Sequence, residues 1–153
     1  FVPTTLLNSG LQRLLEVRRV VGLRNPAHSL VKLMNPVQGK SLLVTSYTHP
    51  EYAVSMAETL ALLQGNALLL RGTEGEAVAD PRRTPTMQGY IAGQLVERQE
   101  HQGGTLPSLP DLPPTTDAGA TATYIRQVLA GQQPVPTPIA QQVAHILHLV
   151  QAL

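Results

Sequence analysis

Residues 41–70 contain the pattern that most constrains how this chain can fold, namely two apolar segments separated by an amphipathic one. Residues 41–47 (SLLVTSY) have the composition of a β-strand, which His49-Pro50 ends. Between Glu51 and Leu63 apolar side chains recur every three or four residues, as in a helix, and Gly65 is the expected left-handed terminator. Residues 66–70 (NALLL) predict a second strand. This order is typical of a βαβ unit with parallel strands, so we expect an α/β fold.

The composition agrees with a single α/β domain. The chain has 153 residues, of which 42% are hydrophobic and only five are aromatic, so its core must be built from aliphatic side chains. Cysteine is absent, which excludes disulfides, a thiolate nucleophile and cysteine-ligated metal sites. The apolar runs are far shorter than the roughly 20 residues that a membrane-spanning helix needs. We therefore expect a cytoplasmic protein without a membrane partner.

A helix is predicted over residues 10–21, with Leu11, Leu14 and Leu15 on one face. Arg18 falls in the middle of this apolar stripe. Two alternatives follow. Either the guanidinium points inward and needs an acidic or phosphate partner, or the helix ends near Val17 and leaves Arg18 and Arg19 in a solvated turn.

The C-terminal half predicts a hairpin, a loop and two helices. Residues 87–98 are expected to form a hairpin that turns at Gly93-Gln94, and the Pro-rich residues 101–116 an extended loop. Helices are expected from residue 116 or 117 to Ala130 and from Thr137 onward. Their expected buried faces are Ile125, Val128 and Leu129 in the first, and Ile139, Val143, Ile146, Leu147 and Val150 in the second. His145 and His148 are expected to be exposed, because no third metal ligand lies near them in the sequence.

Positive charge is concentrated in the first quarter of the chain. The net charge is only +1, yet residues 1–40 carry six basic side chains against Glu16 alone, and the remainder carries five basic and nine acidic residues. The region is either an anion-binding surface or a solvated face. The six are Arg13, Arg18, Arg19, Arg24, Lys32 and Lys40.

Polar residues also follow each strand of the predicted βαβ unit. Residues 47–49 follow the first strand and residues 71–74 the second. Because ligands bind at the carboxyl ends of the strands in open α/β sheets, these are the positions at which a site is expected.

Several of these segments match a known family in their order along the chain. Residues 17–25 (VRRVVGLRN), preceded by Phe1-Val2-Pro3 and Gly10-Leu11, and residues 30–36 (LVKLMNP) resemble the C-terminal part of glycosyltransferase family 3, the anthranilate phosphoribosyltransferase group. The second run looks like that family's Leu-Gly-Pro-Leu-Thr-Asn-Pro type motif. The resemblance implies a C-terminal α/β domain of the nucleoside phosphorylase/phosphoribosyltransferase type, with a βαβ unit and flanking helices over residues 1–153. The family's N-terminal helical domain and Gly-rich phosphate loop would then lie outside this chain, which we expect to be a piece of a longer one.

The amino-acid sequence of residues 22–30 (GLRNPAHSL) and of residues 71–76 (RGTEGE) looks closer to the bacterial YbiB-type branch than to the enzymes of tryptophan synthesis. The resemblance implies a homodimeric protein that binds nucleic acid, most readily DNA, without regard to sequence. It also places Arg18 at the position of the arginine that faces the aromatic amine substrate in the enzymes. The candidate phosphate or nucleic-acid ligands are Arg18, Arg19, Arg24, Lys32 and Arg71, and the substrate-pocket candidates are Asn25 and His28.

The departures from the family argue against catalysis. No Gly-Thr-Gly-Gly-Asp type loop occurs in the chain, and the Asp-Glu pair that holds magnesium in the enzymes aligns with Gly75-Glu76, so one carboxylate is lost. We therefore expect no catalytic residue, no bound metal and no cofactor. The alternative is a phosphoribosyltransferase that uses phosphoribosyl diphosphate and magnesium, with Glu74 replacing the lost carboxylate.

Overall fold

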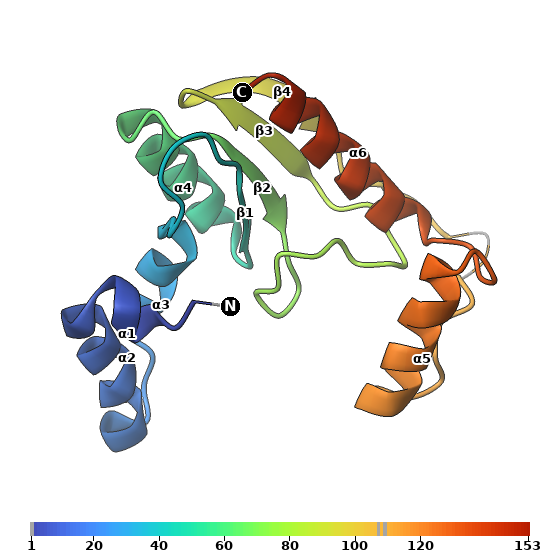
Figure 1. The fold of residues 1–153 in the computed structure, drawn as a ribbon, viewed down its shortest axis with the longest axis horizontal. Coiled ribbons are helices and arrows are strands. Elements are labelled where there is room, and N and C mark those ends of the chain that lie inside the picture. Colours follow the sequence, from blue (N-terminus) through green and yellow to red (C-terminus); the bar gives the residue numbers. More distant parts are fainter. Residues whose placement is uncertain (1, 107, 109) are drawn as a thin grey trace.

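The computed structural model describes residues 2–106, 108 and 110–153, so Phe1 and two positions of the Pro-rich loop lie outside the described residues. A four-stranded sheet in the order β1-β2-β3-β4 forms the centre (Figure 1). Strands β1 and β2 are parallel, whereas β3 pairs antiparallel with both β2 and β4. The parallel pair confirms the βαβ unit, and the result is a mixed α/β fold. The strands are β1 (Leu43–Tyr47), β2 (Ala67–Arg71), β3 (Met87–Ile91) and β4 (Gln94–Gln99).

Strand β2 is the core of the molecule. Its residues 67–70 are fully buried, which requires apolar side chains on both faces of the strand. Ala67 and Leu69 pack with the side chains of helix α4 (Pro50–Leu62) on one face. Leu68 and Leu70 pack on the other face with Leu149 of helix α6 (Thr137–Gln151). The fold therefore has three layers, with the sheet between α4 and α6 (Figure 1).

Two tight turns connect α4 and the hairpin to this core. The left-handed position after α4 belongs to Gln64 (φ 49°), not to Gly65 as predicted. A Cβ at Gly65 would lie 3.1 Å from the Leu60 side chain, so that side chain would have to shift slightly to accommodate it. The hairpin turns at Ala92-Gly93, with φ 46° and 75°, one residue earlier than predicted, as in a type I′ turn.

Helix α6 lies on the sheet with a different face from the one predicted. Ile146 packs against the core as expected, but Val143, Leu147 and Val150 are about half exposed. The buried polar residue Gln142 sets the orientation, since its Oε1 accepts a hydrogen bond from Ala79 N (2.8 Å) and its Nε2 donates to the Ala77 carbonyl. Apolar periodicity cannot identify such a polar contact. The buried side chains of α6 are Pro138, Gln142 and Leu149.

The carboxylate of Glu97 on β4 holds both histidines of α6. Its Oε1 lies 3.0 Å from Nδ1 of His145, and its Oε2 lies 2.8 Å from Nδ1 of His148. The side chain of His148 is 70% exposed, as predicted, but that of His145 is only 21% exposed. The prediction for His145 was wrong because its partner, Glu97, is 48 residues away in the sequence.

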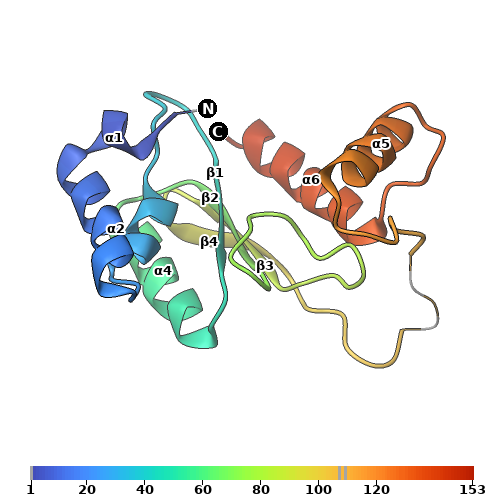
Figure 2. The ribbon, with the colours of Figure 1, turned by 90° about the horizontal axis from the view of Figure 1, so that it is seen from below.

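The remaining helices extend to either side of the layers. The N-terminal part contains α1 (Thr4–Leu7), α2 (Ser9–Val21), α3 (Ala27–Leu30) and the 3-10 helix η1 (Val31–Leu33), and α5 (Ala118–Leu129) lies at the opposite end of the molecule (Figure 2). No side chain of α5 is buried, and Leu129 is 81% exposed, so its predicted buried face is wrong. The apolar side of this amphipathic helix does not pack against a second layer in the part of the chain that the structure describes. Among the described residues, no helix combines the length and the apolar character that crossing a membrane requires.

The double burial of β2 predicts where truncation costs stability. Leu69→Ala should lower the free energy of unfolding by roughly 2–5 kcal/mol, since it removes a fully buried side chain between sheet and helix. Leu62→Ala, at a position that is 85% exposed on α4, is the matched control and should change it by less than about 0.5 kcal/mol. Urea unfolding followed by circular dichroism measures both, and equal midpoints for the two variants would contradict the assigned core.

Candidate functional site

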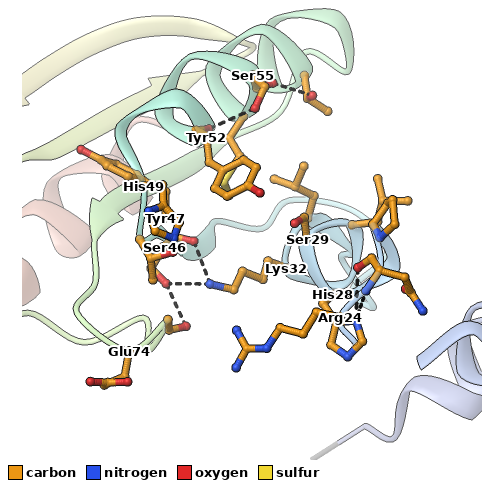
Figure 3. A pocket seen from close by; sticks show the side chains of 18 of the residues that line it. Arg24, His28, Ser29, Lys32, Ser46, Tyr47, His49, Tyr52, Ser55 and Glu74 are labelled. Atoms are coloured by element: carbon orange, nitrogen blue, oxygen red, sulfur yellow. Dashed lines mark hydrogen bonds between the residues drawn. The ribbon is translucent and has the colours of Figure 1, made fainter. Parts of the chain in front are cut away.

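A pocket of about 840 Å³ lies between the N-terminal helices and α4 (Figure 3). One wall comes from residues 18–33, the opposite wall from α4, and the base from the end of β1 and the loop at residues 74–75. The carboxyl end of β1 thus opens into the pocket, as expected for an α/β sheet. Four of the seven predicted strand-end residues line it, namely Tyr47, Thr48, His49 and Glu74. Arg71, Gly72 and Thr73 are not among its lining residues.

Three cationic side chains of the first wall face this pocket. Arg18, Arg24 and Lys32 line it, and Figure 3 shows the Arg24 and Lys32 side chains extending toward the loop that carries Glu74. Glu74 is the one acidic residue among the lining residues, and the part of the chain that the structure describes has no salt bridge to any of the three cations. The wall therefore has an excess of positive charge, which attracts an anionic ligand.

The position of Arg18 matches neither of the two alternatives in full, because the residue is helical but its side chain is exposed. Helix α2 continues to Val21 and ends at Gly22, whose N–H donates to the Arg18 carbonyl (2.8 Å) and whose φ of 76° is left-handed. Arg18 is thus helical, and the prediction that the helix ends near Val17 was wrong. No residue of α2 is buried, so the guanidinium is exposed at the pocket instead of lying within a core.

Asn25 and His28 shape the first wall. Asn25 donates from Nδ2 to the Leu14 carbonyl (2.6 Å) and accepts from Ala27 N at Oδ1 (3.0 Å), which ties α2 to the start of α3. The Nδ1 of His28 lies 3.3 Å from Asn25 N, and both side chains line the pocket. Asn25 therefore fixes the position of α2 relative to α3 in this wall of the pocket.

Lys32 links the first wall to the base of the pocket. Its Nζ donates to the Ser46 carbonyl (3.2 Å), and the Ser46 hydroxyl donates to the Gly75 carbonyl (2.9 Å). Thr45 on β1 donates from Oγ1 to the Lys32 carbonyl (2.9 Å), which fixes η1 against the strand. Burial lowers the pKa of Lys32, and the charge of Glu76 opposes that effect. The ammonium group is therefore partly desolvated, where an anion gains more from it.

The loop at residues 73–76 uses the Glu76 carboxylate for its own structure. The carboxylate accepts from Thr73 N (2.9 Å), from the Thr73 hydroxyl (3.0 Å) and from Glu74 N (2.8 Å). Burial raises the pKa of Glu76, but these hydrogen bonds outweigh it and hold that pKa below its ordinary value. Gly75 has φ 98°, and a Cβ there would lie 3.0 Å from Lys32 Nζ.

This loop does not fit a magnesium site of the kind that the family resemblance implies. Glu76 is engaged by the loop itself, Gly75 has no side chain, and Glu74 supplies a single carboxylate to the pocket. Within the described residues no group of three or more histidine, aspartate or glutamate side chains is arranged to hold a metal ion.

The other predicted basic residues lie outside the pocket lining. Arg19 is exposed on α2, and Arg71 is exposed at the end of β2 opposite Tyr47. Two further arginines are engaged elsewhere: Arg82 pairs with Asp80 (2.7 Å), and Arg83 donates to the carbonyls of Gln102 and Gly104. The structure thus brings together three of the five predicted phosphate ligands.

Two features of the site were missed in the sequence. Ser46 connects Lys32 to Gly75, and no sequence signal pairs residues so far apart. Tyr52, which is 43% exposed, lines the pocket from the first turn of α4, with Ser55 and Thr59 at the following positions of the same wall. The spacing of these three residues is helical and was visible beside the apolar stripe of α4.

The fold and the pocket define a mixed α/β domain whose pocket has one wall rich in cationic side chains. No protein-family model matches the chain. Over 150 aligned residues it is 36% identical to the protein named "Uncharacterized protein YbiB" of Escherichia coli (strain K12), and the alignment covers 94% of this chain. The chain spans 45% of the length of that relative. The similarity to YbiB agrees with the expected branch, while membership of glycosyltransferase family 3 stays a prediction.

The Glu76 contacts predict a pH-dependent contribution to stability. A carboxyl whose pKa is lower in the folded than in the unfolded state stabilises the fold above its unfolded pKa, and this effect is lost as the pH falls through the folded pKa. Glu76→Gln should therefore be less stable than the unchanged protein at pH 7, with the difference shrinking below the ordinary carboxyl range. Urea midpoints from pH 7 to pH 3 measure it. Glu58→Gln, on the exposed side of α4, is the control, and a difference independent of pH would contradict the role of Glu76.

Proposed function

We propose that this chain binds the phosphate backbone of nucleic acid, in particular DNA, without regard to base sequence, through the wall formed by Arg18, Arg24 and Lys32. The observation that carries the proposal is the convergence of these three cations, from α2, the following turn and η1, on one pocket with a single acidic lining residue. Contacts of lysine and arginine with phosphates supply affinity but do not read sequence. The similarity to YbiB supports the same branch of proteins.

The proposal extends to the setting of this domain. The domain belongs to the nucleoside phosphorylase/phosphoribosyltransferase type, as part of a longer cytoplasmic homodimer without catalytic activity. In support, the sheet order contains the expected βαβ unit, and the relative is more than twice as long as the aligned region. The engagement of Glu76 within its own loop supports a non-catalytic role over a magnesium-dependent phosphoribosyltransferase.

The proposal predicts a salt-dependent affinity that depends on the pocket cations. If the three cations each neutralise a phosphate, they account for a slope of about −2.7 in log affinity against log salt, or roughly 40-fold between 50 and 200 mM. The triple variant Arg18→Gln/Arg24→Gln/Lys32→Gln should lose this part of the slope. Arg126→Gln, on exposed α5 at the far end of the molecule, is the control and should bind as the unchanged protein does.

Fluorescence anisotropy with duplexes of two unrelated sequences measures these slopes. A salt-independent affinity, a preference for one sequence, or equal slopes for the triple variant and the control would contradict the proposal. Release of diphosphate from phosphoribosyl diphosphate in the presence of magnesium would favour the transferase instead.

A further inference from the structure

The pocket has a second wall whose chemistry differs from that of the cationic one. Tyr52, Ser55 and Thr59 of α4 line it, and none of them carries a charge. Figure 3 shows the ring of Tyr52 extending into the space between α4 and the segment that carries Ser29 and Lys32. A phosphate group alone would contact only the cations, so the neutral wall leaves space for a second, uncharged part of a ligand.

The ring of Tyr52 is placed for stacking. His49 lies against it edge to face, with 6.0 Å between ring centroids and an interplanar angle of 64°, which supports the ring without covering both of its faces. The side chain is 43% exposed even though it lines the pocket, so its burial is incomplete in this chain. Aromatic side chains beside a positively charged groove are the usual stacking surface for unpaired bases.

The hydroxyl groups on the same wall are oriented as acceptors. Thr59 donates its hydroxyl hydrogen to the Ser55 carbonyl (2.7 Å), and Ser55 donates to carbonyls of the preceding turn at 3.4 and 3.5 Å. With their hydrogens directed at the helix, the oxygens can accept from the N–H groups of a base edge. Every nucleobase has an aromatic face that can stack on Tyr52 and a polar edge that can reach these oxygens. This wall therefore tolerates different bases.

The volume of the pocket is large enough for a ligand that has both a phosphate group and an uncharged part. A pocket of about 840 Å³ falls within the range of roughly 300–1,000 Å³ that small-molecule and nucleotide-sized ligands occupy. A nucleobase in an intact duplex is stacked and paired. It cannot reach the bottom of such a pocket unless it leaves the DNA double helix.

We propose that the pocket binds one unpaired nucleotide of a nucleic-acid strand, with the base stacked on Tyr52 and the phosphate held by Arg18, Arg24 and Lys32. This inference rests on the proposed function and narrows it: single strands and unpaired ends should bind more tightly than a duplex at equal salt. The cations set the affinity for the backbone, whereas the α4 wall sets the preference for an unpaired base.

Substitution of Tyr52 separates the inference from the proposed function. Tyr52→Leu should weaken binding of a single-stranded oligonucleotide by about tenfold and leave binding of a duplex of equal length unchanged, while Tyr52→Phe keeps the ring and should bind as the unchanged protein does. An oligonucleotide with one 2-aminopurine reports the stacking, because its emission is quenched by the unchanged protein and by Tyr52→Phe but not by Tyr52→Leu. Urea midpoints of the three proteins verify that each is folded.

Three outcomes would overturn the inference and leave the proposed function standing: equal single-strand affinity for Tyr52→Leu and the unchanged protein, absence of quenching, or duplex binding as tight as single-strand binding. If 2-aminopurine ribonucleoside monophosphate binds as tightly as the oligonucleotide, the site takes free nucleotides and the strand is not its ligand. A complete absence of DNA binding by the unchanged protein would instead defeat the proposed function itself.

Discussion

The burial of β2 on both faces is the constraint on which the rest of the structure depends. Its four fully buried residues can be covered only by one layer on each side, and α4 and α6 supply those layers. Once α4 is fixed on one face, the turn between β1 and α4 has to lie at the carboxyl edge of the sheet. The pocket is formed there because the N-terminal helices contact the same edge through η1.

The hydrogen bonds from Lys32 to Ser46 and from Ser46 to Gly75 connect the pocket to this fold. They join the basic N-terminal segment, the end of β1 and the loop after β2, which are distant in the sequence. The same loop uses Glu76 to satisfy its own backbone N–H groups. An acidic residue that could have held a cation therefore stabilises a loop, and the charge that remains at the pocket is mainly positive. A positively charged wall of this kind attracts an anionic ligand.

Much of the secondary structure follows from local pattern. The βαβ unit, the hairpin and the two C-terminal helices were predictable because apolar periodicity, proline and glycine act over a few residues. The faces of α5 and α6 were not, since apolar side chains such as Val143 and Leu129 satisfy the helical pattern equally well whether or not a second layer covers them. The contact of Gln142 with residues 77–79 decides the orientation of α6, and the sequence has no signal for it.

At the site, too, some features could be predicted from the sequence and others only from the tertiary structure. The sequence alone determined that Arg18, Arg24 and Lys32 belong to an unusually basic segment, and that Tyr47 to His49 lie at the end of a strand. Only the tertiary structure decided that these three cations share one pocket while Arg19 and Arg71 do not, and that Tyr52 faces them. The physical reason is that charge and periodicity are properties of neighbouring residues, whereas a pocket depends on the direction in which side chains from separate elements extend after the layers have packed.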